Sequence, residues 1–159
     1  LVLDVGTGSG YVGERLAETT GARVIGTDIN PMACRRAKAN GVETVRGDLT
    51  TPFRGNSFDT IVFNPPYLPA VDDIELDEWF ETAVTGGDSG RAVINSFLSD
   101  VGRVIRPDGR IYLLISSETG QYAVTELATA EGFNVQVVER VAYPDEELLI
   151  LRLTCGAVN

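Results

Sequence analysis

The sequence predicts an α/β fold in which seven strands form a mostly parallel sheet, with helices on both faces and an antiparallel hairpin at the C-terminal end. Three observations support this prediction. Short apolar, β-branched runs alternate with segments of helical periodicity. Glycine or Asn-Gly turns separate many of these segments. The last two strand-like runs are joined by a short turn, Tyr143-Pro144-Asp145-Glu146, which is typical of a hairpin.

The first part of the chain contains four predicted strands and two predicted helices. Apolar runs bounded by turn residues indicate strands at residues 1–5, 23–28, 42–46 and 59–63. The first helix covers residues 11–18, with Val12 and Leu16 on one face, and Gly21 ends it. The second helix covers residues 32–39.

The second part of the chain contains two predicted helices and three predicted strands. The helices cover residues 91–105 and 119–131, and the strands cover residues 110–116, 133–142 and 147–153. Pro107-Asp108-Gly109 is expected to form a tight turn. Each helix has apolar residues at helical spacing, which are Val93, Phe97, Val101, Val104 and Ile105 in the first and Tyr122, Val124 and Leu127 in the second.

Length and composition favour a globular protein. Residues 1–159 are expected to form a single domain, because the chain is long enough for one core and is 43% apolar. No apolar run is long enough to cross a membrane. Residues 68–90 are acidic and rich in aromatic residues and glycine, which is typical of a lid or binding loop. The chain begins directly on a predicted strand, so we expect that an N-terminal segment is missing.

The residue types exclude several kinds of chemistry. The sequence contains no histidine, which excludes His-based triads, His metal ligands and His acid–base catalysis. Cys34 and Cys155 lie far apart and form no Cys-x-x-Cys pair. A disulfide scaffold and a zinc site are therefore poor interpretations, no metal is expected in this chain, and a reducing cytoplasm fits.

The net charge is −10, and all of the 13 basic residues except Lys38 are arginines. This sign disfavours a nucleic-acid binder, which needs clustered Lys and Arg for phosphate contacts. The same composition is expected of a protein that works in high salt, where screening removes long-range repulsion. That second hypothesis weakens the first conclusion, because a halophilic surface is acidic whatever the protein binds.

A glycine-rich turn joins the first strand to the first helix. The turn is Gly6-Thr7-Gly8-Ser9-Gly10, and Asp4 precedes it. Glycines let the backbone approach a ligand closely, and a helix N-terminus offers free N–H groups to a nucleotide-type cofactor. The Gly-x-Gly-x-Gly spacing differs from the Gly-x-Gly-x-x-Gly of dinucleotide-binding folds.

Three aspartates, Asp4, Asp28 and Asp48, stand at or near the ends of the first three predicted strands. Parallel strand ends meet in one crevice, so together with the glycine turn they predict a cofactor pocket. A carboxylate at Asp28 could accept both hydroxyls of a ribose. The alternative is that Asp28 or Asn30 caps the next helix, which has Pro31 near its first turn.

The fourth predicted strand ends at Asn64-Pro65-Pro66-Tyr67 (NPPY). Two successive prolines stop a strand and make a stiff bend. There an amide side chain, a free carbonyl and an aromatic ring can converge. The alternative is a proline-rich turn with Tyr67 as a packing residue.

Taken together, these motifs resemble the class I S-adenosylmethionine-dependent methyltransferases. The narrower resemblance is to the HemK-like protein-glutamine methyltransferases, in the archaeal and eukaryotic release-factor branch. It covers nearly the whole chain and rests on the following segments: Asp4-Val5-Gly6-Thr7-Gly8-Ser9-Gly10, Thr27-Asp28-Ile29-Asn30-Pro31, Gly47-Asp48-Leu49, Val62-Phe63-Asn64-Pro65-Pro66-Tyr67 and Gly86-Gly87-Asp88-Ser89-Gly90-Arg91.

The resemblance implies a Rossmann-like fold and a site for S-adenosylmethionine, with S-adenosylhomocysteine as product. The implied cofactor-binding residues are Asp4, Gly6, Thr7, Gly8, Gly10, Asp28, Ile29, Asp48, Leu49 and Asn64. The implied catalytic residues are Asn64, Pro65, Pro66 and Tyr67. In this interpretation Asp48 and Leu49 contact the adenine, and the Asn64 and Pro65 oxygens accept the two N–H bonds of an acceptor amide.

The implied substrate is the glutamine of the Gly-Gly-Gln loop of a class I release factor. The implied partner is a small zinc-binding activator subunit, which forms a heterodimer through the edge strand at residues 42–46, from Val42 to Arg46.

Three alternatives stay open on the sequence alone. They are a nucleic-acid amino methyltransferase that uses Arg54, Arg91, Arg103, Arg106 and Arg110, a NAD-dependent oxidoreductase, and an inactive scaffold subunit that binds the cofactor.

Overall fold

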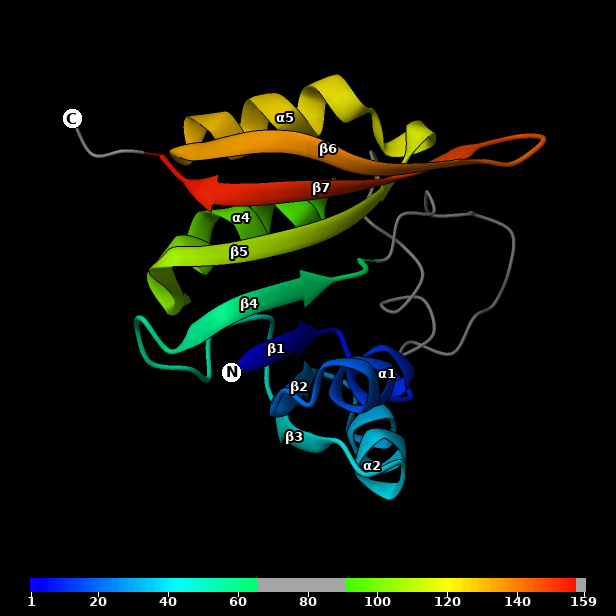
Figure 1. The fold of residues 1–159 in the computed structure, drawn as a ribbon, viewed down its shortest axis with the longest axis vertical. Helices are drawn as coiled ribbons and strands as arrows, with labels where there is room; N and C mark the ends of the chain where they lie inside the picture. The colour runs from blue at the N-terminus through cyan, green and yellow to red at the C-terminus, as the bar shows by residue number, and fades with distance from the viewer. Residues whose placement is uncertain (66–90, 157–159) are drawn as a thin grey trace.

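The computed structural model describes residues 1–65 and 91–156. Within them, seven strands form one sheet in the order β3-β2-β1-β4-β5-β7-β6 (Figure 1). The parallel strands are β1 (Val2–Val5), β2 (Val24–Asp28), β3 (Glu43–Arg46), β4 (Phe58–Phe63) and β5 (Ile105–Ser116). The hairpin strands β6 (Phe133–Ala142) and β7 (Glu147–Cys155) are antiparallel, and β7 pairs with β5. The predicted fold class is confirmed.

Side-chain alternation along β1 separates the two faces of the sheet. Leu3 and Val5 are fully buried in the main apolar cluster, which includes residues of helix α4 (Ala92–Val104). Asp4 points to the opposite face and accepts a hydrogen bond from the N–H of Gly13 in helix α1 (Tyr11–Thr20). Because successive side chains of a strand point to opposite faces, α1 and α4 cover opposite sides of the sheet.

The remaining helices follow the same division. A Cβ on Gly10, which precedes α1, would lie 2.9 Å from Ala37 Cα in helix α2 (Pro31–Ala39), so α2 lies close beside the start of α1. Helix α5 (Gln121–Ala130) follows a short 3-10 turn, η1 (Ser117–Thr119), and buries Val124 and Ala128 in the same cluster as α4. Helices therefore lie on both faces, as the sequence predicts.

Two predicted helix faces are wrong in part. Val12 is 40% exposed, and α1 instead packs through Gly13. A Cβ on Gly13 would lie only 3.2 Å from Asp4 Oδ2, so a glycine lets the helix approach the sheet closely. Tyr122 is 76% exposed, and α5 is buried through Val124 and Ala128.

The predicted tight turn at Pro107-Asp108-Gly109 falls inside β5, which begins at Ile105 and not at Arg110 as expected. Its pairing with β4 shifts register here: Phe58 lies opposite Ile105, and Thr60 lies opposite Arg110. Two steps along β4 thus match five steps along β5. A Cβ on Gly109 would lie 3.0 Å from the Arg106 carbonyl oxygen, so the chain folds tightly here, within a bulge of the strand and not between two separate elements.

The two edges of the sheet are β3 and β6, so the prediction of an edge strand at residues 42–46 is confirmed. The predicted loop at residues 68–90 lies outside the described residues, which resume at Arg91. No helix in the described part of the chain is long and apolar enough to cross a membrane.

Phe97 tests the packing of α4 against the sheet. Its ring is fully buried, and its centroid lies 4.6 Å from that of Phe63 in β4. We expect Phe97→Ala to lower the free energy of unfolding by about 3–5 kcal/mol, because it removes apolar contacts and leaves a cavity. Chemical denaturation measures the change. Tyr122→Ala is the matched control, and we expect it to cost less than about 0.5 kcal/mol since this ring faces solvent. Equal effects of the two substitutions would contradict the packing described here.

Candidate active site

The predicted site residues gather at the carboxyl edge of the parallel strands. Val5, the last residue of β1, pairs with Thr27 on one side and with Phe63 on the other. Gly6 therefore follows β1 between Asp28, at the end of β2, and Asn64, which follows β4. Figure 1 shows the arrowheads of β1, β2 and β4 pointing to the side where α1 begins. This is the position at which open α/β sheets bind ligands.

All three glycines of the glycine turn have positive φ, at 62° for Gly6, 56° for Gly8 and 85° for Gly10. Side-chain-bearing residues rarely adopt this conformation. Among the described residues, a Cβ on Gly8 would meet nothing nearer than the Gly6 carbonyl oxygen at 3.9 Å, so they leave the backbone open there. The turn can therefore admit a ligand against its main chain, beside the N-terminal end of α1.

Asp4 fastens the glycine turn and α1 to the sheet. Asp4 is only 3% exposed, and Oδ2 accepts hydrogen bonds from Thr7 Oγ1 at 2.7 Å and from the Gly13 N–H at 3.1 Å. Thr7 is 7% exposed, so its side chain serves this bond and does not line an open surface. Asp4 and Thr7 thus shape the turn. Their predicted direct contacts with a cofactor stay predictions.

The burial of Asp4 changes its titration. Desolvation raises the pKa of this carboxyl group from its ordinary 3.8 to about 6, although the Thr7 and Gly13 hydrogen bonds act in the opposite direction. The negative charge of Asp28 raises it further.

Asp28 joins the turn to the end of β2. Oδ2 accepts a hydrogen bond from the Gly8 N–H and Oδ1 accepts one from the Asn30 N–H, both at 2.9 Å. Of the two residues considered as helix caps, Asn30 is the one that caps α2, because its Oδ1 accepts from the Met32 N–H at 2.8 Å. Asp28 is half-buried, and each carboxylate oxygen keeps acceptor capacity for a hydroxyl.

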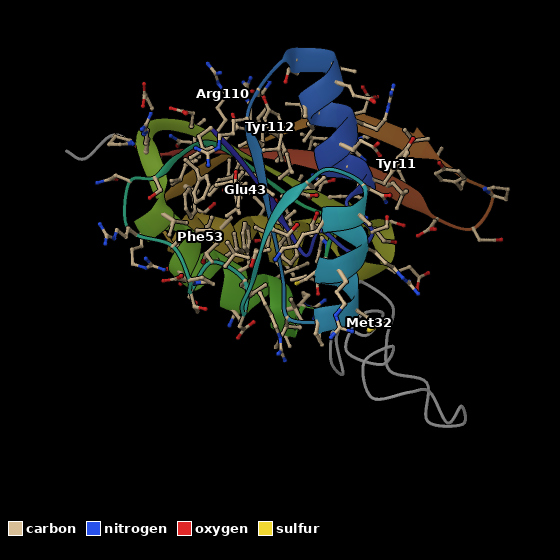
Figure 2. The ribbon with its side chains drawn as sticks, turned by 90° about the horizontal axis from the view of Figure 1, so that it is seen from below. Tyr11, Met32, Glu43, Phe53, Arg110 and Tyr112 are labelled. Carbon is tan, nitrogen blue, oxygen red and sulfur yellow. The ribbon has the colours of Figure 1, made fainter. Side chains whose placement is uncertain are left out.

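The Asp48 loop is brought to the same place by a backbone hydrogen bond. The Gly47 N–H donates to the Asp28 carbonyl at 3.0 Å, so Asp48 and Leu49 follow directly beside the end of β2. Asp48 is exposed and Leu49 is half-buried. Ile29, the neighbour of Asp28, is 42% exposed. Figure 2 shows Tyr11 and Met32 on α1 and α2 at one side of the molecule, and both are exposed.

Asn64 and Pro65 follow β4 on the other side of the glycine turn. The Asn64 side chain is exposed, whereas Pro65 is buried. Phe63, which precedes Asn64, lies next to the glycine turn, because a Cβ on Gly6 would be 3.5 Å from its ring. The Phe63 ring also packs against Phe97. Pro66 and Tyr67 lie outside the described residues. The structure thus brings together every predicted site residue that it describes.

Sequence reasoning missed one residue of the site. Gly26 lies in the middle of β2, and a Cβ there would come within 2.8 Å of the Thr7 side chain. Glycine at this position leaves the space in which Thr7 reaches Asp4. An isolated glycine inside a strand pattern is a signal of close backbone approach and could have identified it. In residues 1–65 and 91–156, no three His, Cys, Asp or Glu side chains are grouped to hold a metal ion.

Comparison with known proteins agrees with this geometry. A family model described as a methyltransferase domain matches residues 2–87. The chain is 32% identical over 156 residues to a protein of Methanocaldococcus jannaschii assigned as a protein N5-glutamine methyltransferase, across 94% of this chain and 79% of that protein. It is 36% identical to a release factor glutamine methyltransferase of Moorella thermoacetica, across 95% of this chain and 58% of that enzyme. The chain therefore spans little more than half of this bacterial relative.

A solved structure extends the agreement to three dimensions. The Mtq2–Trm112 complex of E. cuniculi, responsible for methylation of the eRF1 translation termination factor, contains a chain 30% identical to this one. The TM-score is 0.79, and the match covers 98% of this chain and 84% of that chain.

The buried carboxyl of Asp4 gives a pH-dependent prediction. Its folded-state pKa of about 6 exceeds the ordinary 3.8, so the folded protein holds this proton more tightly and loses stability as the pH rises through that interval. The difference corresponds to about 3 kcal/mol. We expect the free energy of unfolding of Asp4→Asn, relative to wild type, to rise by about this amount between about pH 4 and about pH 7.

Urea denaturation without added ligand, at a series of pH values, measures this difference. Asp108→Asn, which removes an exposed carboxyl group, is the matched control. A stability difference between Asp4→Asn and wild type that did not change with pH would show that Asp4 is not buried as described.

Proposed function

Because the chain belongs to the HemK-like family of protein N5-glutamine methyltransferases, we propose that it methylates the side-chain amide nitrogen of a glutamine. The glutamine is that of the Gly-Gly-Gln loop of a class I translation termination factor, with S-adenosylmethionine as methyl donor and S-adenosylhomocysteine as product. One observation carries the proposal: Asn64, with an exposed amide, follows β4 directly beside the glycine turn that follows β1.

The residues at the carboxyl edge fit S-adenosylmethionine. The open backbone at Gly8 and the first N–H groups of α1 suit the methionine end, the half-buried Asp28 suits the ribose hydroxyls, and the Asp48 loop suits the adenine. When bound, S-adenosylmethionine supplies a methyl group on a positively charged sulfur, which an in-line nucleophile can displace. The chain's own contribution is to hold the two reactants in the required geometry.

Asn64 and Pro65 hold the acceptor amide. An amide nitrogen is a poor nucleophile because its lone pair is delocalised into the carbonyl. Asn64 Oδ1 and the Pro65 carbonyl are acceptors on one rigid bend, and together they match the two N–H bonds of a primary amide. Two such bonds fix the direction of the nitrogen and favour its pyramidal form, so these oxygens act most strongly in the transition state. Pro66 and Tyr67 complete the motif in this proposal, with Tyr67 packed on the planar amide.

The activator subunit binds at β3. In support, a chain of a complex with Trm112 is 30% identical to this one. The strand is at the sheet edge, its register with β2 is regular, and Val45 is 37% exposed. The opposite edge strand, β6, is interrupted at Val138, where its register with β7 shifts. A bulge of this kind hinders pairing with another strand, so β3 is the better template. The activator is small and carries its own zinc.

A nucleic-acid amino methyltransferase is not favoured. The named relatives modify glutamine, and three of the five arginines considered for a basic path are engaged within the protein. Arg103 pairs with Asp100, Arg106 pairs with Asp59, and Arg91 donates to the Thr119 carbonyl. The methyltransferase-domain match likewise disfavours a NAD-dependent oxidoreductase.

We further propose that the protein works in the cytoplasm and in high salt. The two cysteines are free thiols, which is consistent with a compartment that keeps thiols reduced. The net charge of −10 suits an environment in which salt screens repulsion between charges.

The test is methyl transfer from labelled S-adenosylmethionine in high salt, with the candidate activator present or absent. The acceptors are the termination factor, its Gln→Ala loop variant, RNA and DNA. We expect label only in the wild-type factor, and only with the activator. Label in nucleic acid would transfer the assignment to the amino-base methyltransferases. Cofactor binding without any methylation would indicate an inactive scaffold.

Asn64→Ala is the decisive variant in that assay. We expect kcat to fall about 100- to 1,000-fold, because one preorganised acceptor aimed at the reacting amide is lost. Binding of S-adenosylhomocysteine should change much less. Asn95→Ala, an exposed position on α4, is the matched control. Full activity of Asn64→Ala would exclude the proposed role of its side-chain oxygen.

Substitutions at the two sheet edges test the partner site. Val45→Asp places a charge on β3 that binding would desolvate, so we expect the activator to co-purify at least about tenfold less. Val138→Asp on β6 is the matched control, since Val138 is 39% exposed. We expect it to retain the activator, as measured by pull-down. The reverse pattern would place the partner on the other edge.

A further inference from the structure

Leu49 has a strained backbone. Its φ is +45°, in the left-handed region that favours glycine. Leu49 is the second residue of a tight turn, which is closed by hydrogen bonds from the Thr51 N–H and Oγ1 to the Asp48 carbonyl, at 3.0 and 2.7 Å. In turns with positive φ at this position glycine is the preferred residue. A leucine remains there only where the surrounding structure holds it.

Residues of α4 hold the turn immediately after Leu49. Thr50 is fully buried, and its Oγ1 donates to Asp100 Oδ2 at 2.6 Å. Arg103 Nη2 donates to the Thr50 carbonyl at 3.2 Å. Arg103 also binds Asp100 through Nε at 2.8 Å and Nη2 at 2.7 Å. We call Thr50, Asp100 and Arg103 the α4 clamp.

The far end of the same loop is fixed as well. Arg103 Nη1 donates to the Phe53 carbonyl at 2.6 Å, and the Phe53 ring, which Figure 2 labels, packs edge-on against Phe58 with centroids 5.0 Å apart. The near end is held by the Gly47 N–H on the Asp28 carbonyl. With both ends fixed, the loop cannot relax the strain by moving as a whole.

The clamp is charge-assisted. The hydrogen bonds from Arg103, and to a smaller extent that from Thr50, hold the pKa of Asp100 below its ordinary value, although partial burial acts against them. Asp100 is therefore ionised at neutral pH, and hydrogen bonds to an ionised acceptor are the stronger kind.

We propose that the α4 clamp is a positioning network that holds Leu49 in its left-handed conformation and thereby places Asp48 and Leu49 for the adenine end of the cofactor. This inference rests on the proposed function, in which those two residues contact adenine. The clamp residues do not touch the cofactor and act only through the turn. Helix α4, which packs under β4 through Phe97, is then coupled to cofactor binding as well.

The experiment is calorimetric titration of S-adenosylhomocysteine into the chain co-purified with its activator. We expect Arg103→Gln and Thr50→Val each to raise Kd about tenfold. The KM for S-adenosylmethionine should rise similarly, while kcat at saturating cofactor and the KM for the acceptor stay unchanged. Arg106→Gln is the matched control, because it removes an arginine paired with Asp59, outside the clamp, and should leave Kd unchanged.

A double variant tests whether the clamp acts through Leu49. Leu49→Gly removes the backbone strain, and by itself it weakens binding through the lost side chain. Adding Arg103→Gln to Leu49→Gly should then raise Kd less than about twofold, because a glycine does not need to be held.

Three results would overturn the inference. The first is an unchanged Kd in Arg103→Gln and Thr50→Val with only a lower Tm, which would make the clamp purely structural. The second is the same tenfold loss in the Leu49→Gly background. The third is wild-type protein that binds no S-adenosylhomocysteine, which would contradict the proposed function as well, whereas the first two leave that function intact.

Discussion

The site depends on one buried carboxyl group. Asp4 accepts hydrogen bonds from Thr7 in the glycine turn and from Gly13 in α1, so a single side chain fixes both the turn and the start of the helix on the sheet. Its position is costly, since burial raises its pKa to about 6. That cost is offset locally by two short-range donors, and it secures a backbone made of three glycines with positive φ, which has little conformational preference of its own.

Close approach of main chains is the second constraint on the site. At three positions a glycine lets two elements approach each other closely. Gly26 leaves room for Thr7 against β2. Gly13 lets α1 approach Asp4, and Gly10 lets the start of α1 lie beside Ala37 of α2. The N–H groups of Gly8 and Gly47 donate to Asp28, and these hydrogen bonds bring the glycine turn and the Asp48 loop together. The crevice is thus assembled from backbone groups first, and the exposed side chains are carried on it.

Different strands of the sheet carry the residues proposed for the cofactor and those proposed for the acceptor. Strands β1 to β3 carry the residues suited to the cofactor, and β4 carries Asn64 and Pro65 for the acceptor amide. Phe63 of β4 is buried with Phe97 of α4 in the main apolar cluster, which also extends under β1, β5 and β7. The outer edge at β3 is short and regular, which suits strand addition by a partner, whereas the long β6 is bulged. The residues that we propose act on the acceptor therefore follow a strand in the middle of the sheet, and the accessible edge lies on the cofactor side.

The sequence by itself determined the order of the elements and the principal site motifs. Apolar periodicity, the glycine turn and the three aspartates are local signals, so the strands, most helix ends and the crevice could be predicted from them. The buried face of α1 could not be predicted, because a helix that packs through Gly13 shows no apolar stripe there. The fold placed the Pro107-Asp108-Gly109 segment in an unpaired bulge inside β5, because β4 pairs with Ile105 before it and with Arg110 after it. The tertiary structure also decided that Asn30 caps α2 while Asp28 binds the glycine turn, and that Asp4 is turned inward. These outcomes depend on contacts between residues distant in sequence, which no local pattern contains.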